Sequence, residues 1–225
     1  MRLNKFLASG TGLSRRKADD AIIDGRVAIN GRLAHQGMDV VEADIVTLDG
    51  KSVTPTTTEA TTVMLNKPRG YVVSRVGQGS KTVYELLPAK YQQLIPVGRL
   101  DKDSSGLLLF TNDGQLAHKL THPSHEKTKV YEITLDKPLQ PLHRQMIHEH
   151  GLQLEDGLSR LQLERLSEDD DIHWTVRMHE GRNRQIRRTF AALGYNVQVL
   201  HRTRFGSFNL GELSPGRFLQ LTHIL

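Results

Sequence analysis

Apolar residues follow a helical period near the start of this chain and then a strand-like one. Residues 3–8 and 15–24 place apolar side chains three and four positions apart, which predicts two short helices. Residues 27–29 and 46–48 are short apolar runs, each followed by an Asn-Gly or Asp-Gly pair, which is typical of strands joined by tight turns. Because so few elements bury only a small core, we predict a binding module here rather than an enzyme.

The longer remainder of the chain mixes the two periods in no repeating strand–helix–strand order. Strand-like runs lie at 63–66, 107–110, 130–135, 161–163, 174–178 and 197–200, and helical runs lie at about 113–120, 139–150 and 184–193. This order predicts an α+β fold with a mixed, mainly antiparallel sheet rather than a doubly wound one.

Residues 54–62, TPTTTEATT, separate these two parts of the chain. The stretch is rich in threonine and lacks apolar periodicity, so it is typical of a linker. We therefore expect a small α+β domain over 1–56, a linker over 57–62 and a larger domain over 63–225.

Composition narrows the cellular setting of the protein. The chain has no cysteine, which excludes a disulfide framework and a cysteine metal site and suits a reducing compartment. No apolar run approaches the roughly 20 residues of a membrane span, and the N-terminus is too weakly apolar for a signal peptide. We therefore expect a cytoplasmic protein that does not enter a membrane.

Positive charge is concentrated in one stretch of the chain. The formal net charge is +5, which favours a polyanionic partner, and residues 181–210 contain six arginines and no acidic residue. In a helix over 184–193, Arg184, Arg187 and Arg188 share a face, which predicts contact with nucleic-acid phosphates. A solvated helix without a ligand is the alternative.

The run VGRLDKDSSGLLLFTNDG at 97–114 contains the main candidate for chemistry. Asp101 lies between Arg99 and a buried apolar strand, and Gly98 and Gly106 allow the loop to approach a ligand closely. A carboxylate held next to an arginine is a candidate catalytic group. A salt-bridged turn without catalytic function explains the same residues equally well.

Metal binding does not fit the sequence. DKDSSG matches the first positions of a calcium-binding loop, but the last position is Asn112 rather than a bidentate glutamate, and a strand rather than a helix follows. His143, His148 and His150 lack the spacing of a zinc motif. We therefore expect no metal site.

The first helices carry a second basic cluster. Ser14 is a candidate N-terminal cap, and the cations after it oppose the helix dipole, which suggests a phosphate site, with a solvated basic turn as the alternative. The segments RLNKFLA, SRRKA and GRVAINGR resemble an S4 RNA-binding module, a family that binds structured RNA. By this resemblance the RNA-binding candidates are Arg2, Lys5, Arg15, Arg16, Lys17 and Arg26.

Further segments extend the resemblance to nearly the whole chain. GRLDKDSSGLLLFTNDG, KTKVYEI and EGRNRQIRR follow LNKPRG in that order, and together they resemble the RsuA/RluB-type branch of the ribosomal-RNA pseudouridine synthases. The resemblance implies the pseudouridine synthase fold and isomerisation of a uridine in RNA, with no cofactor and no metal. EGRNRQIRR is closer to the large-subunit (23S) group than to the small-subunit (16S) group.

The resemblance also implies roles for three residues. Asp101 matches the catalytic aspartate, which acts either as a nucleophile or as a base. Tyr131 matches a tyrosine that stacks on the uracil and serves proton removal, and Arg187 matches the cation that ion-pairs with the aspartate. The target base must leave its stack to reach such a site.

Phosphate contacts are expected from basic residues in and around these motifs. These residues are Lys67, Arg99, Arg182, Arg184, Arg188, Arg202 and Arg204. The expected partner is ribosomal RNA or a ribosomal-subunit assembly intermediate, and the protein is expected to be a monomer. A non-catalytic RNA-binding or ribosome-assembly protein also explains the charge pattern, but it does not explain an acidic residue at Asp101 near phosphates.

Overall fold

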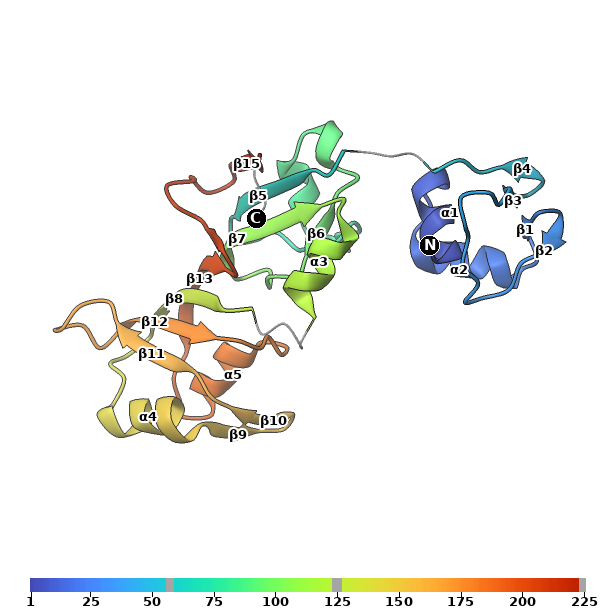
Figure 1. Ribbon diagram of the computed structural model, residues 1–225. Coiled ribbons are helices and arrows are strands. Elements are labelled where there is room, and N and C mark those ends of the chain that lie inside the picture. Colours follow the sequence, from blue (N-terminus) through green and yellow to red (C-terminus); the bar gives the residue numbers. More distant parts are fainter. Residues whose placement is uncertain (56–58, 123–126, 223–225) are drawn as a thin grey trace. The chain divides into compact units, whose positions relative to one another are not determined.

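The structure of the chain is a computed structural model that describes residues 1–55, 59–122 and 127–222 (Figure 1). Two units, Met1–Glu59 and Ala60–Leu225, each have a hydrophobic core of their own. Residues 57 and 58 of the predicted linker lie outside the described residues.

Within residues 1–55, helices pack on a small sheet. The helices are α1 (Leu3–Thr11) and α2 (Arg15–Ile23), and the strands β1 (Val27–Ile29), β2 (Arg32–Leu33), β3 (Val46–Leu48) and β4 (Lys51–Ser52) lie in the order β2-β1-β3-β4. The Ser14 hydroxyl accepts a hydrogen bond from the Lys17 backbone N–H at 3.2 Å, which confirms the predicted cap. Asn30 and Gly31 both have positive φ, as the predicted hairpin turn requires.

Apolar residues on one face of each helix form the core of this unit. Leu3 and Leu7 are one turn apart on α1, and Ala18 and Ile22 are one turn apart on α2. All of them are buried in one cluster with Val27 of β1. The charged residues of α2 consequently remain on its solvent-facing side.

The second unit is built on a larger sheet. Its strands are β5 (Thr62–Lys67), β6 (Ile95–Val97), β7 (Ser105–Thr111), β8 (Lys129–Leu135), β11 (Gln162–Arg165), β12 (His173–Met178), β13 (Val197–Phe205), β14 (Phe208–Asn209) and β15 (Phe218–Leu221). The main order is β11-β12-β8-β13-β7-β5-β15, with β6 paired to β7 and β14 to β13. All of these pairs are antiparallel except β13–β7, which confirms the predicted α+β fold with a mixed, mainly antiparallel sheet.

The parallel pair β13–β7 is a seam that joins two parts of the sheet. In Figure 1, β8, β11 and β12 lie on one side of this seam and β5, β6 and β7 on the other. His201 pairs with Ser105, and Arg202 pairs with Gly106. Gly106 has a φ of 103°, and a Cβ at this position would lie 2.3 Å from the Arg202 carbonyl oxygen. Glycine is therefore required for the two strands to meet.

Helical segments and one hairpin connect these strands. They are 3₁₀ turns at Val83–Leu86 and Ala89–Tyr91, α3 (Gly114–Thr121), α4 (Pro141–Gln145) followed by a π-helical turn (Met146–His150), the hairpin β9 (Leu152–Leu154) and β10 (Gly157–Ser159), and α5 (Gln185–Ala191). The helices predicted near 113–120, 139–150 and 184–193 are confirmed. The strand predicted at 197–200 is longer, because its pairing with β8 continues past two irregularities, through buried Arg202 to Phe205.

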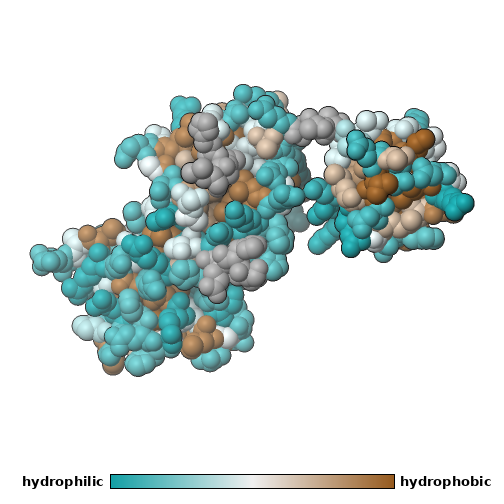
Figure 2. Space-filling view, in the orientation of Figure 1, coloured by the Kyte–Doolittle hydropathy of each residue, from teal (hydrophilic) through white to brown (hydrophobic). Residues whose placement is uncertain are grey.

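The interior of the second unit is aromatic and aliphatic. Trp174, Phe110 and Phe190 are completely buried in its main cluster. Hydrophilic residues predominate on the face shown in Figure 2, with apolar residues scattered between them. Among the described residues, no helix is long and apolar enough to cross a membrane.

Candidate active site

A cleft of about 910 Å³ opens in the second unit. Its walls come from the loop before β7, from β8, from the segment between β12 and α5, and from β13. The candidate residues that line it are Arg99, Asp101, Tyr131, Arg182, Arg184 and Arg202. The fold thus brings Asp101 and Tyr131, which are 30 positions apart in the sequence, into one cavity.

A buried lysine holds the loop that carries Asp101. Lys67, at the end of β5, is 0% exposed, and its ammonium donates to the carbonyl oxygens of Pro68 at 3.1 Å, Asp101 at 3.0 Å and Ser104 at 2.7 Å. Burial lowers the pKa of Lys67 to about 8, against the opposing effect of Asp103 and Asp101. Lys67, predicted to bind RNA, thus has its ammonium enclosed by carbonyl oxygens of the protein itself.

The cation that contacts Asp101 is not the predicted one. Arg184 Nη1 lies 3.4 Å from Asp101 Oδ2. Arg187, the residue expected to form this ion pair, instead places Nε 3.4 Å from Asp103 Oδ2 and donates from Nη2 to the Asp103 carbonyl oxygen at 3.2 Å. Arg187 also donates to the Val197 carbonyl oxygen and is not among the described residues that line the cleft.

Backbone geometry explains this exchange of partners. Arg184 precedes α5 and has left-handed backbone angles, φ 46° and ψ 32°. This conformation, uncommon for a residue with a side chain, directs Arg184 toward the Asp101 loop, while Arg187 lies in the first turn of α5 against β13. The sequence pattern assumes a helix through 184 and therefore cannot distinguish the two arginines.

Tyr131 lies in the cleft wall formed by β8. It is 8% exposed, and it is the register partner of Val176 on β12 and of Arg202 on β13. Lys129, two residues earlier on the same strand, also lines the cleft. Burial and the neighbouring Arg202 lower the pKa of Lys129, with Glu180 opposing them. Lys129 was not predicted, although the period-two pattern of β8 places it beside Tyr131.

Arg202 also differs from its expected role. It is 2% exposed, its Nε donates to the Leu107 carbonyl oxygen at 2.8 Å, and its guanidinium carbon lies 4.8 Å from the centre of the Phe205 ring. This side chain therefore connects β13 to β7 across the seam. Arg202 thus lines the cleft as a buried side chain rather than as an exposed charge.

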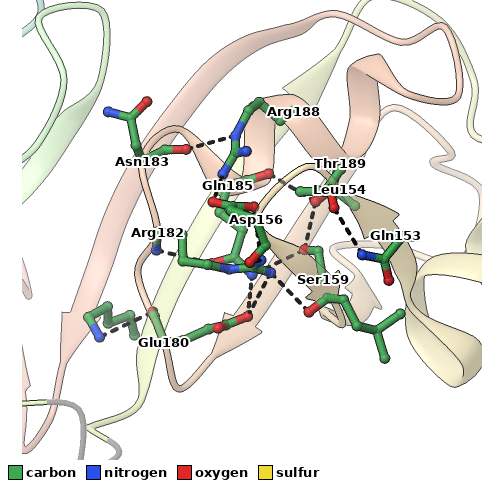
Figure 3. A network of polar contacts seen from close by, with 12 residues as sticks. Gln153, Leu154, Asp156, Ser159, Glu180, Arg182, Asn183, Gln185, Arg188 and Thr189 are labelled. Atoms are coloured by element: carbon green, nitrogen blue, oxygen red, sulfur yellow. Dashed lines mark hydrogen bonds and ion pairs between the residues drawn. The ribbon is translucent and has the colours of Figure 1, made fainter.

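Two more of the predicted phosphate-binding arginines are engaged within the protein (Figure 3). Arg182 donates from Nη1 to the Asp156 carbonyl and carboxylate oxygens, both at 2.9 Å, and from Nη2 to the Leu158 carbonyl oxygen at 2.9 Å. Arg188 donates from Nη2 to Asp156 Oδ2 at 2.6 Å and from Nε to the Asn183 carbonyl oxygen at 2.8 Å. These contacts fix the hairpin β9–β10 to the start of α5.

A buried polar cluster supports the same junction. Gln185 is 2% exposed, and its side-chain amide donates to Ser159 Oγ at 3.1 Å and to Glu180, while its carbonyl oxygen accepts from the Arg182 backbone N–H. The hydroxyl oxygens of Ser159 and Thr189 lie 2.8 Å apart and share a hydrogen bond (Figure 3). A buried network in which these groups satisfy one another makes the segment before α5 rigid.

The remaining basic candidates lie on the surface. Arg2, Lys5, Arg15, Arg16, Lys17 and Arg26 are all exposed on the first unit, and Arg99 and Arg204 are exposed on the second. Arg26 forms a two-pronged ion pair with Asp49, and Arg2 lies 3.3 Å from Asp39. Cations on such exposed pairs exchange partners at little cost, so these residues can still reach phosphates.

Comparison with known families agrees with this site. Residues 61–192 match the sequence model of the family described as RNA pseudouridylate synthase, and residues 1–46 match that of the S4 domain. The chain therefore belongs to the RNA pseudouridine synthases, a family of isomerising enzymes. Within that family, it is one of the members that join an S4 RNA-binding domain to the synthase domain.

Relatives with functional names cover almost the whole chain. A ribosomal large subunit pseudouridine synthase B of Bacillus subtilis is 37% identical, with 98% of this chain and 92% of that protein covered. A protein of the same name from Xanthomonas campestris is 39% identical, and this chain spans only 47% of its length, while 98% of this chain is covered. A ribosomal small subunit pseudouridine synthase A of Pasteurella multocida is 35% identical, with 99% and 96% covered.

The fold has a close counterpart among solved structures. A crystal structure described as a pseudouridylate synthase superposes with a TM-score of 0.70 at 34% sequence identity. The match covers 99% of this chain and 96% of that chain. Both units of the present chain thus have counterparts in a single known protein.

Proposed function

We propose that this protein isomerises a specific uridine of large-subunit ribosomal RNA to pseudouridine, acting as a monomer in the cytoplasm. The observation that carries the proposal is the position of Asp101, a carboxylate that lines a cleft otherwise rich in cations. A surface that only bound RNA would gain nothing from an acidic residue at this point. The relatives from Bacillus and Xanthomonas are named for the large subunit, which favours that substrate.

The reaction requires an ionised carboxylate next to the ribose. During isomerisation the bond between C1′ and N1 breaks, a bond between C1′ and C5 forms, and the proton on C5 is lost while N1 gains one. We assign Asp101 as the group that attacks the sugar or removes a proton from it. Arg184 Nη1 lies 3.4 Å from Asp101 Oδ2, and both residues line the cleft.

Tyr131 is proposed to act on the base. Its ring forms part of the cleft wall, where a uracil that has left its stack can lie against it. Its hydroxyl is assigned to proton removal at C5. In Tyr131→Phe, the RNA affinity should stay close to that of the parent, because the ring remains, while product formation stops at a late step.

Residues 1–56 are proposed to dock structured RNA, while residues 63–225 perform the reaction. The exposed cations Arg15, Arg16 and Lys17 at the start of α2 supply phosphate contacts. Arg99 at the rim of the cleft contacts the strand that holds the target. The partner is ribosomal RNA or an assembly intermediate of a ribosomal subunit.

The catalytic assignment is tested with Asp101→Asn. We expect this variant to release no tritium from RNA that contains 5-tritiated uridine, while a binding titration gives an affinity equal to that of the parent. The substitution preserves shape and removes one negative charge, so phosphate contacts do not weaken. Tritium release at the parental rate would refute the role of Asp101, and an inactive parent would refute the enzymatic function.

The substrate is tested by mapping pseudouridines in ribosomal RNA from cells with and without the gene. Loss of one pseudouridine from the 23S RNA is the expected result. Loss of one from the 16S RNA instead would support the small-subunit alternative, which the Pasteurella relative favours. An unchanged map in both RNAs would contradict the proposal.

A further inference from the structure

A second carboxylate, Asp103, contacts both arginines near Asp101. Arg184 directs Nη1 to Asp103 Oδ1 at 3.2 Å and Nη2 to Asp103 Oδ2 at 3.3 Å, which is a two-pronged ion pair. Arg187 places Nε 3.4 Å from Asp103 Oδ2 and binds the Asp103 carbonyl oxygen. Two acidic and two basic side chains therefore form one neutral cluster beside the cleft.

Asp103 lies beside the cleft but not in it. Asp101 and Arg184 line the cavity, whereas Asp103 and Arg187 are not among the described residues that do so. Arg187 is anchored in turn to the Val197 carbonyl oxygen of β13. A chain of contacts therefore runs from β13 through Arg187 and Asp103 to Arg184, which lines the cleft.

This arrangement determines how Arg184 meets Asp101. Asp103 occupies both terminal nitrogens of the guanidinium, so that Arg184 reaches Asp101 with Nη1 alone, at Oδ2 and at 3.4 Å. A two-pronged pair between Arg184 and Asp101 would bind both carboxylate oxygens. The shared geometry therefore limits the contact between Arg184 and Asp101 to the single oxygen Oδ2.

We infer that Asp103 is a positioning residue for the isomerisation. It acts through Arg184, because it binds both terminal nitrogens of the guanidinium. This inference rests on the proposed function. Without Asp103, Arg184 turns either to a two-pronged contact with Asp101 or into the cleft. In both cases the reactive carboxylate is misplaced, whereas the removal of a negative charge does not weaken binding of RNA.

The test compares Asp103→Asn, Arg184→Gln and the double variant in single-turnover reactions at saturating RNA, using a tritiated transcript of the target region. We expect Asp103→Asn to slow product formation by on the order of 10- to 100-fold, since small misplacements in an active site have effects of that size. Its RNA affinity should equal or exceed that of the parent. In the Arg184→Gln background, Asp103→Asn should change the rate by less than about twofold, because the guanidinium through which Asp103 acts is already absent.

Glu149→Gln is the matched control, since it also removes one carboxylate, which is bonded to Gln145 and, among the described residues, forms no ion pair with an arginine. It should react at the parental rate. A rate within about twofold of the parent for Asp103→Asn would overturn the inference, as would an equal loss with and without Arg184, or weakened RNA binding. If the parent itself forms no pseudouridine, the proposed function fails, whereas an active parent with an unaffected Asp103→Asn refutes only the role of Asp103.

Discussion

At the scale of single residues, Lys67 illustrates how one buried cation holds the loop that carries Asp101, the proposed catalytic residue. Replacing it in Lys67→Met leaves carbonyls of Pro68, Asp101 and Ser104 without their donor, at about 1–3 kcal/mol for each buried acceptor. We expect the free energy of unfolding at pH 7 to fall by at least about 2 kcal/mol, and the reaction rate to fall with it. Urea denaturation and tritium release measure the two effects.

The difference in stability between the parent protein and Lys67→Met should depend on pH, with a definite sign. The pKa of Lys67 is about 8 in the folded protein and 10.5 when exposed, so between these values the unfolded chain binds the proton and the folded chain does not. The free energy of unfolding of the parent should therefore rise with pH relative to Lys67→Met, by up to about 3 kcal/mol between pH 8 and 10.5. A difference that stays constant or reverses over this range would contradict the burial of the charge.

Gly106 provides a second residue-scale prediction. In Gly106→Ala, the added Cβ would lie 2.3 Å from the Arg202 carbonyl oxygen at a φ of 103°, so the strands must separate. We expect a loss of stability of at least about 3 kcal/mol, measured by urea denaturation. Gly114→Ala is the control, because nothing lies within 4 Å of its Cβ, and it should change stability by less than about 1 kcal/mol.

Some of these residue-level features could be predicted from the sequence and others could not. Asp101 and Tyr131 lie in motifs whose neighbours specify a loop and a strand, and the cleft contains both. The partner of Asp101 depends on the backbone angles of Arg184, which no pattern of residue types encodes. Lys67 and Arg202 were predicted to contact phosphates, and only the fold shows that both side chains are buried, which is unusual for lysine and arginine.

At the scale of elements, prediction succeeded where apolar periodicity is long enough to be distinctive. Strands β7, β8 and β12 each bury alternating or continuous apolar residues, and all three were located from the sequence. The hairpin β9–β10 was missed, since its strands have three residues each and only Ser159 is completely buried. Its position is determined by contacts with the segment before α5, far along the chain.

The hairpin therefore depends on Asp156. In Asp156→Ala, Arg188 loses its carboxylate and Arg182 retains only the carboxylate of Glu180, so we expect the amide protons of 152–159 to exchange faster with solvent. Hydrogen exchange of the folded protein measures this. Glu164→Ala, which removes the partner of Arg177 at the sheet edge, should cost less than about 1 kcal/mol. Equal effects of the two substitutions would show that Asp156 has no special role.

At the scale of the whole molecule, we expect the first unit to dock RNA and the second to fold and react independently, and truncation tests this. Deleting residues 1–56 should leave the second unit folded, because it has its own core. The affinity for the natural RNA should fall, and the slope of log affinity against log salt should become shallower by about 0.7–0.9 for each phosphate that the shortened protein no longer binds. Binding titrations of both proteins at several salt concentrations test this, and equal slopes would show that the first unit does not dock RNA.

The charge pattern of the sequence predicted RNA binding but not the roles of the individual arginines. The net charge of +5 and the six arginines of 181–210 predict an RNA-binding protein correctly. Arg182, Arg188 and Arg202, however, use their guanidinium groups to hold the second unit together. The carboxylate of Asp156 and the carbonyl groups of Leu107 and Leu158 that engage them lie far away in the sequence, so the charge pattern near the arginines could not reveal them.

Because of the seam between β7 and β13, the cavity that contains Asp101 and Tyr131 forms late in biosynthesis. The bond from Arg202 to Leu107 joins residues 95 positions apart, and contacts so distant in sequence form slowly because the intervening chain must first be ordered. Walls on both sides of the seam are needed before Asp101 and Tyr131 share a cavity. A nascent chain therefore cannot assemble this cavity until residues near 205 have left the ribosome.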